Sequence, residues 1–143
     1  RTHAVGQITP EAQKLIDVTR QSFFEGIKKA VAGNHLFDIS NAIADYVEPF
    51  GYGIVEELVG HGIGHALHED PQIPNFRQRK GIRLMPGMTL AIEPMINIGR
   101  PDVEWLDDDW TVVTEDGSLS AHYENTILIN EEGEPDILTL GHV

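Results

Sequence analysis

The most informative absence in this 143-residue sequence is that of cysteine, of which it has none. A chain without cysteine can form neither a disulfide framework nor a metal site built on thiolates. Any metal ion that this chain binds must therefore be held by histidine nitrogens and carboxylate oxygens.

Basic side chains are also scarce, because 10 Lys and Arg stand against 23 Asp and Glu, which gives a formal net charge of −13. Such a chain repels a phosphate backbone and an anionic lipid surface, so we expect no nucleic acid and no membrane among its partners. No apolar run reaches the roughly 18–20 residues of a transmembrane helix, and no signal-peptide pattern opens the sequence. We therefore expect a cytoplasmic protein.

The composition is that of a globular protein, with 41% hydrophobic and 23% charged residues. The length suits one domain, and no repeat or linker divides it, so we predict a single domain over residues 1–143. A basic cluster at residues 77–83 and an acidic cluster at residues 102–109 lie in stretches rich in Pro, Gly or Asp. We interpret both clusters as solvated loops.

The first part of the sequence is predicted to be helical. Thr9, Pro10 and Glu11 form a helix start signal, and apolar residues then recur every three or four positions until Gly33 and Asn34 end the pattern. A second helix is predicted to begin near Asp38, as its cap, and to end before Pro49 and Gly51.

After Gly51 the apolar period changes to two, which is typical of strands. We predict strands over residues 52–59, 89–95, 111–114, 121–130 and 136–140. Helices followed by strands favour the α+β class, with two helices packed on one face of a mainly antiparallel sheet. The other face must then be an active site, a partner surface or both.

Three histidines fall within eight positions, in a chain that holds seven: His61, His65 and His68. His61 and His65 have the spacing of a helical zinc pair, but the order is not His-Glu-x-x-His. A helix is also disfavoured by about 1 kcal/mol for each of three glycines, Gly60, Gly62 and Gly64. The glycines indicate instead that the backbone closely approaches a ligand or another strand, and we interpret the cluster as functional.

Two carboxylates, Glu93 and Glu124, enter otherwise apolar predicted strands. A buried carboxylate is costly unless it is paired, hydrogen-bonded or metal-bound, and the few basic residues lie mostly in predicted loops. One histidine and two glutamates would suit Mn²⁺, Fe²⁺, Co²⁺ or Zn²⁺ in an open coordination sphere. Since a carboxylate can bridge two metals that activate a water, the residues predict a metal-assisted hydrolase of open identity.

Three segments together carry a family resemblance: residues 59–71, 84–95 and 110–124. They closely resemble the type I methionine aminopeptidases, which have the pita-bread fold of two similar α/β halves. The resemblance covers only the C-terminal half of a family member, so we expect this chain to be one half of that fold. It implies removal of the initiator methionine from nascent peptides whose second residue is small.

The resemblance also implies roles at the metal site. His61 and Glu93 would be terminal ligands of one metal ion, and Glu124 would bridge two divalent ions, which in this family are Co, Mn, Fe or Zn. His65 matches no ligand of the family, and we interpret it as a pocket-rim or structural residue.

Three residues take catalytic or substrate-binding roles by the same resemblance. Glu93 would shuttle a proton. His68 would reach the scissile carbonyl and stabilise its developing negative charge. Trp110 would line the entrance of the substrate pocket.

The sequence departs from the family pattern at several ligands. The family has two aspartate ligands eleven positions apart, and this sequence has no such pair. The family's other catalytic histidine is missing too, while His122 stands where Gln is common and Asn125 where His is common. We therefore expect the chain to be inactive by itself and to need an N-terminal half or a second copy of itself. When isolated, it need not hold any metal ion. The alternative is a non-catalytic half-fold module that self-associates or pairs with a partner chain.

Overall fold

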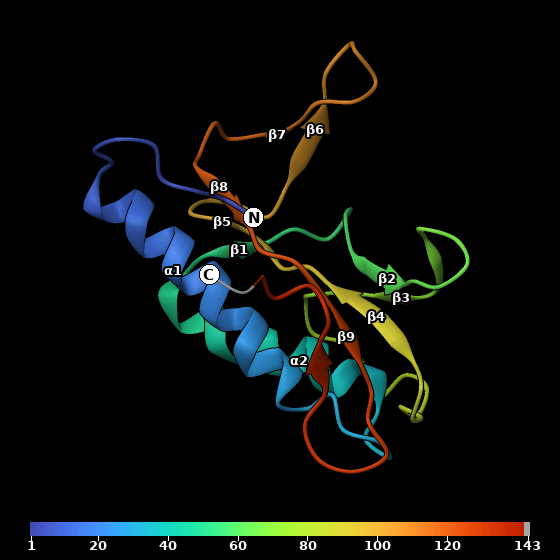
Figure 1. The fold of residues 1–143 in the computed structure, drawn as a ribbon. Coiled ribbons are helices and arrows are strands. Elements are labelled where there is room, and N and C mark those ends of the chain that lie inside the picture. The colour runs from blue at the N-terminus through green and yellow to red at the C-terminus, as the bar shows by residue number, and fades with distance from the viewer. Residues whose placement is uncertain (142–143) are drawn as a thin grey trace.

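The computed structural model describes residues 1–141, in which two α-helices and a short 3₁₀ helix precede ten short strands (Figure 1). The two helices lie side by side on one side of the molecule, and the strands cover the other side. Neither α-helix in the described part is both long and apolar enough to cross a membrane. The prediction of an α+β protein is confirmed.

Helix α1 (Pro10–Ile27) begins where the sequence predicts, because the Thr9 side chain accepts a hydrogen bond from the Ala12 N–H at 3.1 Å. The prediction that it extends to Gly33 is wrong. The apolar spacing continues past Ile27 because Ala30 is fully buried in the following turn. There the Asn34 side chain donates to the Lys29 carbonyl at 3.0 Å.

Helix α2 (Leu36–Val47) begins earlier than predicted: its N-cap is His35, and not Asp38. The Asp38 carboxylate instead lies inside the first turn and accepts a hydrogen bond from the His35 backbone N–H at 2.8 Å. The short helix η1 (Glu48–Phe50) follows, and Gly51 ends it with a φ of 73°, as the Pro49 and Gly51 signal predicted.

The strands form three antiparallel sheets. The three-stranded sheet has the order β1 (Gly53–Ile54), β5 (Met95–Asn97), β8 (Ser120–His122). The five-stranded sheet has the order β10 (Asp136–Ile137), β9 (Asn125–Leu128), β4 (Thr89–Ile92), β2 (Gly60–Gly62), β3 (Glu69–Ile73). The third sheet is a hairpin of β6 (Val103–Trp105) and β7 (Val112–Thr114), which projects from the rest of the molecule (Figure 1).

Three of the predicted strands are interrupted. The chain leaves the five-stranded sheet after Ile92 and enters the three-stranded sheet at Met95. The segment paired with it passes between the same two sheets at residues 123–124, because β4 pairs with β9 and β5 pairs with β8. The prediction for residues 52–59 is likewise reduced to β1, after which the chain bends before β2.

Two strands were not predicted. Strand β3 pairs with the glycine-rich β2, and β6 lies inside the acidic cluster that the sequence indicated to be a loop. Val103 and Trp105 flank Glu104, so apolar and polar side chains alternate in this strand. The alternation covers only three residues, too few to be recognised among the acidic residues around it.

The core lies between the helices and the sheets. Phe23 of α1 and Ile39 and Ile43 of α2 are fully buried, and so are Ile96 and Ile127 of the strands. Aromatic rings extend the core, since Phe23 packs edge-on against Tyr123 at a centroid distance of 5.3 Å. One face of the strands is therefore fixed against the helices, and their other face is left for the site.

The glycines of β2 allow this central strand to lie close to both neighbours. A Cβ atom at Gly60 would overlap the carbonyl oxygen of Ala91, and one at Gly62 would overlap that of Asp70. The sequence left open whether the backbone at these glycines approaches a ligand or another strand. The structure shows that it approaches other strands. His61 lies between them and is held in place by that approach.

We expect Gly62→Ala to lower the free energy of unfolding by about 1–3 kcal/mol, the cost of overpacking a close-packed region. The measurement is urea unfolding followed by circular dichroism. Gly141→Ala is the matched control, because a Cβ atom there would have no neighbour within 4 Å. Equal stability of the two variants would contradict the close approach of β2 and β3.

Candidate metal centre

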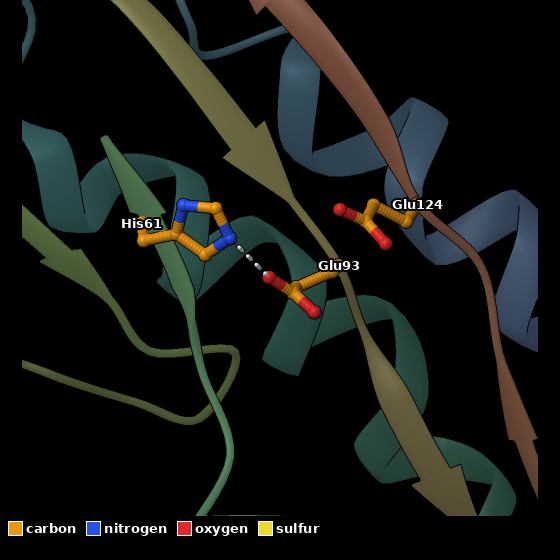
Figure 2. Close-up of side chains that lie close together, drawn as sticks. All are labelled: His61, Glu93 and Glu124. Carbon is orange, nitrogen blue, oxygen red and sulfur yellow. Dashed lines mark ion pairs between the residues drawn. The ribbon is translucent and has the colours of Figure 1, made fainter. Parts of the chain in front are cut away.

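A histidine and two glutamates meet where the strands pass between the two larger sheets. His61 comes from β2, Glu93 follows β4, and Glu124 precedes β9. One ligand atom from each side chain lies within 4.8 Å of the others. Figure 2 shows the His61 ring and both carboxylates directed toward a common point. The structure thus brings together the three residues that the resemblance assigned to metal binding.

Strand register explains why the two carboxylates meet. Ile92 pairs with Asn125 and Met95 pairs with His122, so the Glu93 and Glu124 segments lie opposite each other. Burial alternates along residues 121–129, and the buried residues face the helices. Glu124 therefore faces away from the core, on the uncovered side of the sheet.

The His61 ring is oriented by the backbone. Its Nδ1 lies 2.8 Å from the Gly62 carbonyl oxygen, which can only accept, so Nδ1 carries the hydrogen. Its Nε2 then faces Glu93 Oε1 at 3.2 Å. A cation between this nitrogen and the Glu93 oxygen would be held by both atoms.

No lysine or arginine neutralises these carboxylates within residues 1–141. The ion pairs of Glu93 and Glu124 in that range are all with histidines. The side chain of Glu93 is only 15% exposed, so its negative charge is costly without a partner. The donor set therefore fits a divalent cation, and no arginine of residues 1–141 pairs with these carboxylates instead.

One neighbour of the site was missed by the sequence analysis. His122 Nε2 lies 3.5 Å from Glu93 Oε2 and 3.5 Å from Glu124 Oε2. The signal was present in the sequence, since residues two apart in a strand share a face. The resemblance indicates His122 only as a departure from the glutamine common in the family.

The remaining predicted site residues lie at different distances from the centre. The His68 ring packs edge-on against His61 with centroids 4.3 Å apart, so the structure brings it to the site. His65 is exposed in the loop that joins β2 to β3. Trp110 is 86% exposed in the loop of the projecting hairpin, away from the lining of the cavity beside the site. The functional roles of these residues stay predictions.

An apolar cavity of about 740 Å³ adjoins Glu93. Glu93 and His122 form part of its wall, and most of the remainder is aliphatic, including Val55, Leu58 and Met95. A cavity of this size, with a few polar groups at one end, is typical of a site for a small organic ligand. The cavity therefore has room for an apolar side chain of a ligand next to Glu93.

Two buried amides, Asn75 and Asn125, contact or adjoin the backbone of the two glutamates, and no local pattern in the sequence indicates their contacts. Asn75 is fully buried, and its Nδ2 donates to the Glu93 carbonyl oxygen at 3.1 Å. Asn125 follows Glu124 and accepts a hydrogen bond from Arg1 Nη2 at 2.7 Å. These contacts join residues that are far apart in the sequence, so only the folded chain reveals them.

A turn at Asp116 shapes another wall of the cavity, through Gly117 and Ser118. The Asp116 carboxylate accepts hydrogen bonds from the Arg100 N–H at 2.8 Å and from the Ser118 N–H at 3.0 Å. The bond from Arg100 leads the contacts that lower the pKa of Asp116 from 3.8 to about 2. The ionised form is the one that holds this turn.

A lowered pKa stabilises the fold at pH values above the unfolded value, and that stabilisation is lost as the pH falls through the folded value. For Asp116 these values are 3.8 and about 2. We expect Asp116→Asn to be less stable than the wild type at neutral pH, with the difference shrinking between these two values. Thermal melts across this range measure it, with exposed Asp107→Asn as the control. A difference that does not change with pH would contradict this role.

Replacing Glu93 or Glu124 by Gln tests whether the two carboxylates repel each other without a cation and bind one when it is present. In a chelator, either change should raise the stability by roughly 0.2–1 kcal/mol or leave it unchanged, because one of two adjacent like charges is removed. With Mn²⁺, the wild type should melt at a higher temperature, and the variants should lose most of this gain. Thermal melts with and without Mn²⁺ measure both effects.

The exposed Glu104 of β6 offers the control variant Glu104→Gln, which should keep the full response to Mn²⁺. Destabilisation of both Glu93→Gln and Glu124→Gln in chelator would mean that protein groups already satisfy the carboxylates. That result would contradict the assignment of this cluster as a metal centre.

Comparisons with known proteins agree with the geometry. The sequence model of metallopeptidase family M24 matches residues 1–131. The methionine aminopeptidase of Clostridium acetobutylicum is 58% identical over 141 residues, which are 98% of this chain and 56% of that protein. Methionine aminopeptidase 1 of Bacillus subtilis is 52% identical over 139 residues, which are 96% of this chain and 56% of that protein.

A solved structure agrees with the fold. The crystal structure of methionine aminopeptidase from Thermotoga maritima superposes with a TM-score of 0.91 at 46% identity, covering 94% of this chain and 54% of that one. This chain spans about half the length of the curated relatives it matches. The resemblance seen in the sequence, and a fold that is half of a pita-bread fold, are thus confirmed.

Proposed function

Because this chain belongs to metallopeptidase family M24, we propose that it forms part of a methionine aminopeptidase. Its reaction is the hydrolytic removal of the initiator methionine from nascent peptides whose second residue is small. The observation that carries the proposal is the meeting of His61, Glu93 and Glu124 within 4.8 Å beside an apolar cavity. The 58% identity to a methionine aminopeptidase supports the choice of substrate.

His61, Glu93 and Glu124 would hold divalent ions of the Co, Mn, Fe or Zn kind. When bound, such ions polarise a carbonyl group and lower the pKa of a water molecule. Glu93 lines the cavity with its carboxylate, so it is placed to take a proton from the attacking water. It would then return this proton to the amine that leaves.

The other residues position the substrate. The aliphatic wall formed by Val55, Leu58 and Met95 would receive the methionine side chain. His68 lies against His61 and is open to solvent, so it can donate a hydrogen bond to the carbonyl oxygen as negative charge develops there. Trp110 would line the entrance of the pocket.

We also propose that further ligands come from outside these 143 residues. The chain spans about half the length of its relatives, and its sequence has no two aspartates eleven positions apart. An N-terminal half or a second copy of the chain would supply the missing side of the centre, in the cytoplasm. The 143-residue chain by itself should then turn over little substrate.

A chimera tests the proposed activity. Residues 1–141 replace the matching 56% of the Clostridium acetobutylicum enzyme, whose remaining part supplies the rest of the fold. We expect the chimera to release methionine from Met-Ala-Ser in the presence of Mn²⁺ or Co²⁺. Glu93→Gln in the chimera should lower kcat by about 10²–10⁴-fold, the usual contribution of a positioned acid or base.

The chimera with Glu104→Gln is the control and should keep its activity. A folded chimera that binds metal but releases no methionine would contradict the proposed function and would favour the non-catalytic half-fold. Turnover by the 143-residue chain alone at the rate of the chimera would contradict the need for a second part.

A further inference from the structure

The loop between β2 and β3, residues 63–68, carries His68 beside the metal centre. Its first residue is held by Thr89 of β4, whose carbonyl oxygen accepts from the Ile63 N–H at 3.1 Å and whose hydroxyl donates to the Ile63 carbonyl. From Gly64 to His68 the loop is exposed. The position of His68 therefore depends on how the far end of the loop is fixed.

The Glu69 carboxylate closes the far end of the loop. Its Oε1 accepts a hydrogen bond from the Ala66 N–H at 2.7 Å, the one side-chain hydrogen bond to residues 64–68 in the described part of the chain. Its Oε2 lies over Gly64, where an added Cβ atom would be 2.9 Å away. The third glycine of the histidine cluster thus leaves room for this carboxylate.

His68 lies inside the turn that this hydrogen bond closes. The turn runs from Ala66 to Glu69, and a side chain accepts from the N–H three residues before it, as the glutamate of a capping box does at a helix start. Glu69 itself is fixed, because it is the first residue of β3 and pairs with Gly62. The His68 ring is thereby held against the His61 ring, with 4.3 Å between their centroids.

We propose that Glu69 is a positioning residue, which sets the place of His68 beside the metal centre through its hydrogen bond to Ala66. The inference rests on the role of His68 in the proposed function, and it gives Glu69 no contact with a substrate or a metal ion. The role requires an acceptor oxygen at the end of a side chain of this length. The amide oxygen of glutamine could therefore replace the carboxylate, whereas an alanine side chain could not.

The first experiment measures the position of His68. In the 143-residue chain, proton NMR should show a nuclear Overhauser effect between the rings of His61 and His68. We expect Glu69→Gln to keep this effect and Glu69→Ala to lose it. Asp70→Ala is the matched control and should keep it, since Asp70 is an exposed acidic residue directly after Glu69.

The second experiment measures activity in the methionine-releasing chimera. We expect Glu69→Ala to lower kcat by roughly 10–10²-fold with a much smaller change in KM, since a slight misplacement of a positioned group can cost that much. Glu69→Gln and Asp70→Ala should keep kcat. In a His68→Ala background, Glu69→Ala should lower kcat no further, because Glu69 acts through His68.

An unchanged kcat in a folded Glu69→Ala chimera would overturn the inference, as would the same loss of kcat in the His68→Ala background. Loss of the ring contact in Glu69→Gln would also overturn it. If Glu69→Ala does not fold, Glu69→Asp decides, because its shorter side chain withdraws the oxygen from Ala66 and should lose the ring contact. A chimera that releases no methionine, while the ring contact follows the expected pattern, would remove the proposed function and leave the positioning of His68 in place.

Discussion

The site depends on one constraint of the fold. Two paired segments of the chain, one from β4 to β5 and the other from β8 to β9, cross together between the three-stranded and the five-stranded sheet. Glu93 and Glu124 each lie at this passage, where the strand pairing on both sides fixes them opposite one another. In an uninterrupted strand, these residues would belong to one sheet only. The passage instead places two carboxylates where three separate segments converge, and His61 arrives on the third.

The cost of this arrangement is electrostatic. Two carboxylates are held together on a surface where, among the described residues, only histidines pair with them. A protein that needed these side chains for packing would gain by replacing them with neutral ones. A cation bound between them would offset this cost, and the buried amide of Asn75 donates a hydrogen bond to the Glu93 backbone carbonyl.

The division of the sheet faces explains how the fold and the site coexist. Alternation sends Tyr123 and Ile127 toward the helices, where they join the core, and sends Glu124 to the opposite face. The hairpin of β6 and β7 adds aliphatic side chains to the cavity beside that face. Stability and chemistry thus use opposite faces of the same strands.

Local signals in the sequence predicted the helix start at Thr9, the turn at Gly51 and the choice of Glu93 and Glu124, since each depends only on neighbouring residues. The end of α1 was not predictable, because Ala30 is buried by contacts made outside the helix.

The sequence by itself determined the α+β class, the alternating faces of the strands and the two carboxylates that could bind metal, whereas the choice of His61 among three histidines rested on the family resemblance. These follow from periodicity and from the energetic cost of charge in an apolar strand. Only the tertiary structure decided that His122 lies against Glu93 and Glu124, and that Asn75 donates a hydrogen bond to the Glu93 backbone carbonyl. Such contacts arise from strand register and sheet crossing, which bring distant residues together and leave no periodic pattern in the chain.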